Sequence, residues 1–215
     1  MTLWTILVGA LAGALAGAAL WRWLRTGIYR IDEDEPRLRL DRSWAVVPSA
    51  AVGGALAGVL ADPWLAIAAW IYLVGAVSLI WIDLDVHRVP DRVLRWWAPA
   101  LLAAVLLGAA AGAGGWHVLV TAVLAGLAMA VLFFVLAVVG SMGLGDVKLA
   151  AVTGLMLGAL GWSAVTTGVL AGFAAGAAAA VWLLIRGASR TSHLAFGPAI
   201  IVGAAVAIAR AGITG

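Results

Sequence analysis

The chain has 215 residues, of which 65% are hydrophobic and 11% are charged, and its mean hydropathy is +1.12. Soluble domains carry about 25% charged residues, so this composition excludes an ordinary soluble protein and indicates a polytopic membrane protein. The formal net charge of +3 comes from basic residues in loops between apolar segments, which form no extended basic face for nucleic acid. Because the chain has no cysteine, disulfides, thiolate zinc sites and cysteine nucleophiles are excluded.

A helix needs about twenty apolar residues to cross the hydrocarbon core of a bilayer. The sequence therefore predicts an all-α, polytopic membrane bundle of about eight transmembrane helices, forming one integral membrane domain over residues 1–215. The expected spans are roughly 3–24, 44–61, 64–82, 96–113, 117–139, 147–160, 163–185 and 197–213.

The first apolar segment resembles a signal peptide in its alanine content, but no basic residue precedes it, and Arg22, Arg25 and Arg30 follow it. This asymmetry favours a retained helix with its N-terminus outside. In that orientation twelve of the thirteen lysines and arginines lie in cytosolic loops, and only Arg210 lies near the outer face. We therefore expect a multi-pass protein of the plasma membrane with its N-terminus outside.

The longest polar segment, residues 25–43, contains both acidic and basic side chains. It is too short and too charged to form a core of its own, so we expect a solvated cytosolic connector and no separate soluble domain.

Small residues recur at helical spacing in several of the expected spans. This pattern predicts close packing between helices, although in so glycine-rich a sequence at least one such repeat is expected by chance. The repeats are Gly9, Gly13 and Gly17; Gly54 and Gly58; Gly154 and Gly158; and Gly168, Gly172 and Gly176.

Two groups of acids stand beside apolar segments. One contains Asp83, Asp85 and Asp91, and the other is Asp146 in the sequence Gly-Leu-Gly-Asp-Val-Lys. Two predicted crossings separate the groups, so both face the same side, which the arginine distribution makes the cytosol. The span after Asp146 is short, about 21 Å for fourteen residues, which places Asp146 somewhat below the membrane surface. Acids at such depth indicate function by default.

Two neighbouring carboxyls that share a proton can hydrolyse a peptide bond without a metal, because one activates water and the other protonates the leaving amine. Such a pair titrates as a unit, and the residues alone do not assign the acid and the base. Gly143 and Gly145 can adopt positive φ and allow another backbone to approach Asp146. Taken alone, however, Gly-Asp is also an ordinary turn and helix cap.

The two acidic segments together resemble the type IV prepilin peptidase family of membrane aspartic proteases. In that family an Asp-x-Asp-x-x-x-x-Pro-Asp stretch is paired with a Gly-x-Gly-Asp-x-Lys motif. The matching residues are Asp83, Asp85, Pro90 and Asp91, then Gly143, Gly145, Asp146 and Lys148. Phe196-Gly197-Pro198 resembles the family's C-terminal segment, and the resemblance extends from about residue 64 to the end.

The resemblance implies Asp83 and Asp146 as the catalytic pair. It also implies a prepilin or pseudopilin substrate whose basic leader is cut at the cytosolic membrane edge, before its hydrophobic helix. Larger family members carry a cytosolic region with paired cysteines, linked to zinc and to N-methylation. This chain has no cysteine, so we expect a peptidase-only form without a methyltransferase domain, metal or cofactor.

The other polar residues have ordinary interpretations beside the functional ones. Asp85 and Asp91 can support the pair or bind the leader, but loop acids more often form weak, solvated ion pairs. Lys148 can hold Asp146 or stabilise developing negative charge, and it also suits a membrane anchor. His87, His117 and His193 are too scattered for a metal site.

Two other functions are compatible with the sequence. The first is a proton- or ion-coupled transporter with an aspartate relay. The clustering of the acids at one face of the membrane argues against it. The second is a non-enzymatic assembly protein that acts through its small-residue helix faces. Whichever function is considered, the twelve tryptophans, many of them near span ends, are interpreted as interfacial anchors.

Overall fold

The computed structural model describes residues 3–31, 38–86, 90–112, 114–139, 142–186 and 196–214. Within these ranges it contains eight α-helices and one short 3₁₀ helix, as the sequence predicts for an all-α protein. They are α1 (Leu3–Leu24), η1 (Leu40–Ala45), α2 (Val46–Ala57), α3 (Pro63–Val86), α4 (Asp91–Ala110), α5 (Gly115–Val139), α6 (Leu144–Ala159), α7 (Trp162–Ile185) and α8 (Gly197–Thr214).

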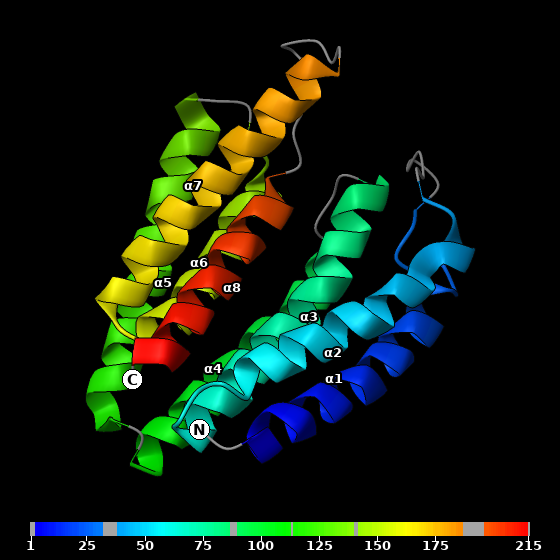
Figure 1. Cartoon of the computed structure of the whole chain (residues 1–215). Helices are drawn as coiled ribbons and strands as arrows, with labels where there is room; N and C mark the ends of the chain where they lie inside the picture. Colours follow the sequence, from blue (N-terminus) through cyan, green and yellow to red (C-terminus); the bar gives the residue numbers. More distant parts are fainter. Residues whose placement is uncertain are drawn as a thin grey trace.

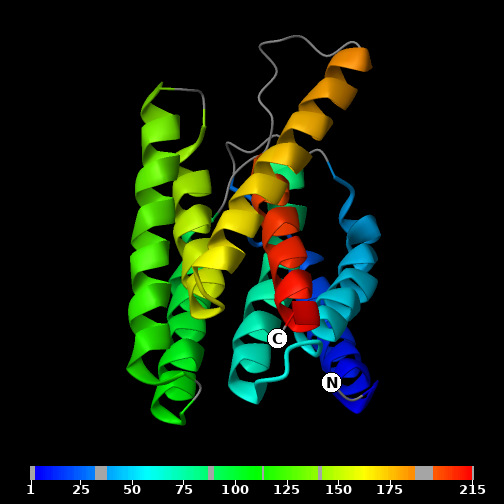
Figure 2. The ribbon, with the colours of Figure 1, turned by 60° about the vertical axis from the view of Figure 1, so that its left-hand side comes forward.

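Successive helices run in alternating directions, so that both chain termini lie at one end of the bundle (Figure 1). The C-terminal end of α3 and the N-terminal ends of α4, α6 and α8 lie together at the opposite end, as the second view also shows (Figure 2). Because α3, α6 and α8 also contact one another, residues in their end turns can meet there.

Six helices in the described part of the chain are long and apolar enough to cross a membrane, which confirms a polytopic bundle. The two shorter ones are α2, with 12 residues, and α6, with 16. At 1.5 Å per residue α6 covers about 24 Å, less than the hydrocarbon core of about 30 Å. The predicted span 44–61 was too long, because α2 ends at Ala57 and a turn containing Gly58 follows.

Local signals explain two helix starts. Asp62 caps α3, since its Oδ1 accepts hydrogen bonds from the backbone N–H groups of Trp64 and Leu65 at 2.8 and 2.9 Å. Helix α4 begins at Asp91, after Pro90 in extended conformation, five residues before the predicted position 96. Apolar content alone missed this turn because it is polar, whereas an acid in a helix's first turn is stabilised by the helix dipole.

The predicted small-residue faces are confirmed as helix contacts. Gly9 and Gly54 lie against each other's backbone between α1 and α2, and Gly154 lies against Ala125 between α5 and α6. Gly172 in the same way approaches Ala199 between α7 and α8. Each of the four repeats has such contacts, so none is a compositional accident. Their close approach gives dispersion contacts where no hydrophobic difference between lipid and side chain is available.

Polar and aromatic contacts join α3 to α4 and α6 in the core. Tyr72 and Thr153, both buried, share a hydrogen bond of 2.9 Å between their hydroxyl groups. Trp97 stacks on Tyr72 with ring centroids 5.3 Å apart and donates its indole N–H to the Ile71 carbonyl at 2.9 Å. The interpretation of Trp97 as an interfacial anchor was therefore wrong, because its N–H is satisfied inside the bundle. Trp96, its neighbour, is exposed.

We expect Gly54→Ala to lower the free energy of unfolding by about 1–3 kcal/mol, because its methyl group has no space against the Gly9 carbonyl. Chemical unfolding in detergent, followed by circular dichroism, measures this change. Val52→Ile adds one carbon on the exposed face of the same helix and should change stability by less than about 0.5 kcal/mol. Equal effects of the two variants would contradict the close α1–α2 contact.

Candidate active site

Asp83 lies in the last turn of α3 and is buried, with 6% of its surface exposed. Its Oδ2 atom has no hydrogen-bond partner among the described residues, which is unusual for a buried carboxylate. This atom faces the start of α8, where a Cβ on Gly197 would lie 2.8 Å from it. The carboxyl thus stands at the junction of α3, α6 and α8, next to Leu149 as well.

Asp146 lies in the first turn of α6, the third residue after the N-cap Gly143. Its backbone N–H donates to the Gly143 carbonyl at 3.0 Å, and its carboxylate interacts with the Gly143 backbone N–H, as an acid at this position of a helix start does. It is half-buried, and it is close enough to Asp83 for the two carboxylates to interact electrostatically. Two acids 63 residues apart in the sequence therefore meet at one end of the bundle.

The glycines before Asp146 are extended or helical, contrary to the positive φ suggested for them. Gly143 has φ −77° and ψ 150°, and Gly145 is helical. Open space is what distinguishes Gly143, since a Cβ there would meet no atom nearer than 3.9 Å. The backbone beside Asp146 is thus accessible.

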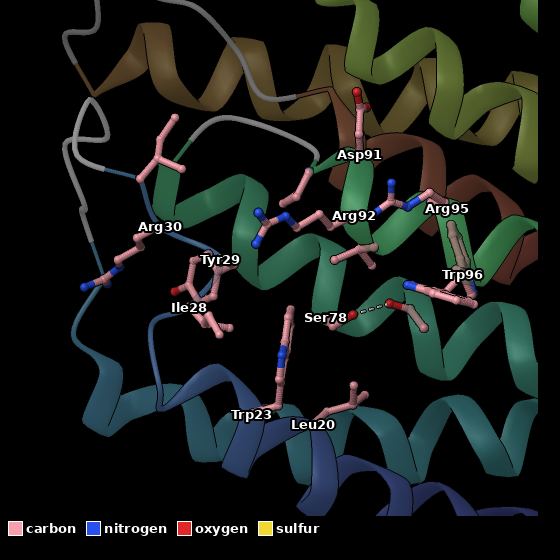
Figure 3. Close-up of a pocket in the computed structure, with 15 residues that line it drawn as sticks. Leu20, Trp23, Ile28, Tyr29, Arg30, Ser78, Asp91, Arg92, Arg95 and Trp96 are labelled. Atoms are coloured by element: carbon pink, nitrogen blue, oxygen red, sulfur yellow. Dashed lines mark hydrogen bonds between the residues drawn. The ribbon is translucent and has the colours of Figure 1, made fainter.

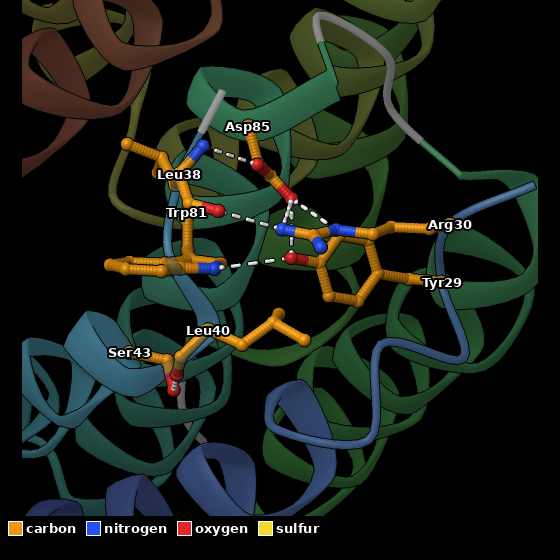
Figure 4. A network of polar contacts seen from close by, with 7 residues as sticks. All are labelled: Tyr29, Arg30, Leu38, Leu40, Ser43, Trp81 and Asp85. Atoms are coloured by element: carbon orange, nitrogen blue, oxygen red, sulfur yellow. Dashed lines mark hydrogen bonds and ion pairs between the residues drawn. The ribbon is translucent and has the colours of Figure 1, made fainter. Parts of the chain in front are cut away.

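Asp85, two residues after Asp83, is fully buried and forms a polar network with the segment that follows α1 (Figure 4). Its Oδ2 accepts hydrogen bonds from the Tyr29 hydroxyl at 2.6 Å and from Arg30 at 2.8 Å, and its Oδ1 accepts one from the Leu38 N–H at 2.7 Å. Burial and the hydrogen bond to Asp85 raise the pKa of the Tyr29 phenol, so it remains a donor.

This network corrects two expectations. Asp85 does not form the weak, solvated ion pair expected of a loop acid, because its carboxylate is enclosed and has several donors. Nor is the segment 25–43 simply a solvated connector. Tyr29 and Ser43 are buried, and Tyr29 packs with Leu24 and Ile82 in a small apolar cluster. A buried charge requires such partners, and the loop supplies them.

Lys148 pairs with Asp91 at 2.6 Å, Nζ to Oδ1, and so joins the first turn of α6 to the first residue of α4. Both side chains are exposed, so the pair contributes at most about 1 kcal/mol. The Lys148 ammonium group thus binds Asp91. This exposed ion pair is the weak, solvated contact that the sequence predicts for Asp91.

Of the three histidines, the structure describes His117 alone, and it lies far from this site. His117 lies in the first turn of α5, at the end of the bundle that holds the termini, whereas His87 and His193 lie outside the described residues. Among the described residues no group of three or more metal-ligating side chains occurs.

A sequence model of the type IV leader peptidase family matches residues 70–184, more than half of the chain. The chain belongs to the type IV leader peptidase family. It is therefore a membrane protease of the aspartic, prepilin peptidase type. The matched region contains both Asp83 and Asp146 and ends before α8. No curated protein and no solved structure matches the chain.

Sequence reasoning missed three residues of this peptidase that contact the acids. Gly197 was noticed only within a family-like segment, and its contact with Asp83 depends on how α8 packs on α3. Tyr29 and Arg30 lie before the family match, and no spacing relates them to Asp85. The one available signal was the acid itself, since a charge beside an apolar span needs a partner.

We expect Asp85→Ala to destabilise the peptidase by about 3–5 kcal/mol, because Arg30 and Tyr29 lose a buried acceptor. Thermal unfolding in detergent and proteolysis of the loop after α1 measure the loss. Asp41→Ala is the control, since it removes an exposed ion pair with Arg39 and should cost less than about 1 kcal/mol. If both variants unfold alike, Asp85 does not anchor this loop.

We expect Gly197→Ala to reduce kcat roughly 10- to 100-fold in a folded protein, because a methyl group 2.8 Å from Asp83 Oδ2 displaces the carboxyl. Cleavage kinetics with a purified prepilin measure this. Val202→Ile, which adds one carbon on an exposed position of the same helix, should leave kcat unchanged. Full activity of Gly197→Ala would mean that α8 does not position Asp83.

Proposed function

We propose that this peptidase removes the leader from type IV prepilins or pseudopilins at the cytosolic edge of the membrane, with Asp83 and Asp146 as its catalytic pair. The observation that carries the proposal is that these two acids stand in the end turns of α3 and α6, at the same end of the bundle, close enough for their charges to interact. The Oδ2 atom of Asp83, which has no hydrogen-bond partner among the described residues, supports the proposal. Leaving a buried carboxylate oxygen without a donor lowers stability, and groups of this kind are concentrated at functional sites.

In the proposed reaction one carboxylate takes a proton from a water molecule as the water oxygen attacks the scissile carbonyl carbon. The resulting tetrahedral intermediate collapses when the other carboxyl gives its proton to the peptide nitrogen, and the C–N bond breaks. The two carboxyls together carry one proton before and after the reaction, so the pair is restored. Asp146, half-buried, has the freer access to water.

The surroundings of Asp146 suit an extended substrate backbone. Gly143 has open space around it, and Leu144 is 65% exposed, so a peptide can approach the start of α6 without a steric barrier. A prepilin helix in the bilayer would bring the leader junction to this end of the bundle. The fully paired Asp85 is assigned a supporting role, as are Lys148 and Asp91.

The arginine distribution supports an active site on the cytosolic side. The helix ends near Asp83 and Asp146 also carry Arg22, Arg92 and Arg186. Because cytosolic loops carry an excess of lysine and arginine, this end is assigned to the cytosol and both termini to the outside.

We expect Asp83→Asn and Asp146→Asn each to reduce leader cleavage by at least about 10²–10⁴-fold, because each variant removes an acid or a base from the reaction. The measurement is co-expression with a tagged prepilin, whose N-terminus is identified by mass spectrometry. Membrane levels of the variants should equal that of the wild type. The product mass also reports whether the new N-terminus is methylated.

Asp41→Asn, which neutralises an exposed acid of the segment before α2, is the matched control and should cleave normally. Cleavage that persists in both Asp83→Asn and Asp146→Asn would refute the aspartate mechanism. Proton-dependent uptake in liposomes that is lost in Asp146→Asn, with no proteolysis by the wild type, would instead support a transporter.

A further inference from the structure

A cavity of about 1020 Å³ lies between α1 and α4, against Gly75 and Ser78 of α3 (Figure 3). Its lining includes neither Asp83 nor Asp146. Leu20 and Trp23 of α1 form one wall, and Trp97 of α4 forms part of another. The volume is at the upper limit of ordinary ligand sites, which are about 300–1,000 Å³.

Three arginines and one aspartate supply the charge of the cavity, and they are Arg30, Arg92, Arg95 and Asp91. Arg30 is neutralised by Asp85, and Asp91 by Lys148. Arg92 and Arg95 have no carboxylate partner in the described part of the chain. Among the described residues, these two positive charges of the cavity therefore have no ion-pair partner.

These two arginines extend from α4 into the space that Trp23 enters from α1 (Figure 3). The first turn of α4 places Arg92 and Arg95 three residues apart, so that they lie on one helix face. Both arginines are exposed, and a guanidinium group donates paired hydrogen bonds to phosphate oxygens, so each can attract an anionic headgroup.

Apart from Tyr29 and Ser78, the rest of the cavity lining is apolar, and exposed residues are part of it. Ile28 and Trp96 in its lining are 62% and 77% exposed, and Trp96 directly follows Arg95 in α4. Exposed tryptophan beside arginine is typical of the headgroup level of a membrane. Apolar walls favour the burial of an acyl chain and contribute nothing to the binding of a soluble phosphate.

We propose that this cavity binds an anionic phospholipid, with its headgroup attracted by the charges of Arg92 and Arg95 and an acyl chain between α1 and α4. Basic pockets between membrane helices recognise anionic headgroups in this way. A leader peptide is a poorer occupant, because its basic residues would be repelled by the charges of Arg92 and Arg95. The site is independent of the proposed peptidase reaction, since binding requires neither aspartate.

The test is a titration of the purified full-length protein in detergent with phosphatidylglycerol, followed by native mass spectrometry. We expect the double variant Arg92→Gln, Arg95→Gln to raise the dissociation constant about tenfold or more. The control double variant Arg25→Gln, Arg186→Gln removes the same charge at the same end of the bundle and should change it less than threefold. Arg25 and Arg186 stack on Trp21 and Trp182, outside the cavity.

Further arms distinguish the possible occupants. Phosphatidylcholine should bind more weakly than phosphatidylglycerol, and millimolar glycerol 3-phosphate should not displace the lipid. The proposal would be overturned if the control variant lost as much affinity for phosphatidylglycerol, or if phosphatidylcholine bound equally well. Displacement of the lipid by glycerol 3-phosphate or by a basic prepilin leader peptide would also overturn it. Because the readout is lipid bound without substrate, a failure of the proteolysis proposal leaves this result unaffected.

Discussion

The close approach of helix backbones at glycine is the constraint on which the rest of the structure depends. Gly154 seats α6 against α5, and Gly172 seats α8 against α7, at separations that leave no space for a Cβ in the first case and little in the second. The hydrogen bond between Tyr72 and Thr153 then joins α3 to α6. Asp146 and Gly197 reach Asp83 because these contacts set the heights and distances of the three helices. In a bilayer such packing replaces the hydrophobic effect as the source of association.

The last turn of α3 shows how two acids of the same type acquire different roles. Asp85 has a complete set of donors from Tyr29, Arg30 and Leu38, so its charge is neutralised and it stabilises the fold. Asp83, two positions earlier, faces α8, and its Oδ2 has no hydrogen-bond partner among the described residues. A carboxylate without donors in a buried site remains available for proton transfer, whereas a fully bonded one is held in place.

The proposed reaction site and the cavity use different parts of the bundle. Asp83 lies against α8 and near Asp146 of α6, whereas Arg92 and Arg95 of α4 line the cavity toward α1. Helix α4 connects the two, because Asp91 pairs with Lys148 of α6 while Arg92 and Arg95 extend into the cavity. A lipid in the cavity would therefore contact the helix whose first residue is tied to the first turn of α6.

The amino-acid sequence by itself determined the helices, the small-residue faces and the pair of acidic motifs. Each of these depends on composition or spacing within one segment, so even the bounds of α1 were predicted to the residue. The tertiary structure alone decided the partners of the acids: Asp85 with Tyr29 and Arg30, Lys148 with Asp91, and Asp83 with Gly197. These contacts join helices distant in the chain, and their geometry depends on packing distances that no local pattern encodes. For the same reason the buried Trp97 was mistaken for an interfacial residue. Trp96 and Trp97 are adjacent in the sequence, and only the packing of Trp97 on Tyr72 distinguishes the buried ring from the exposed one.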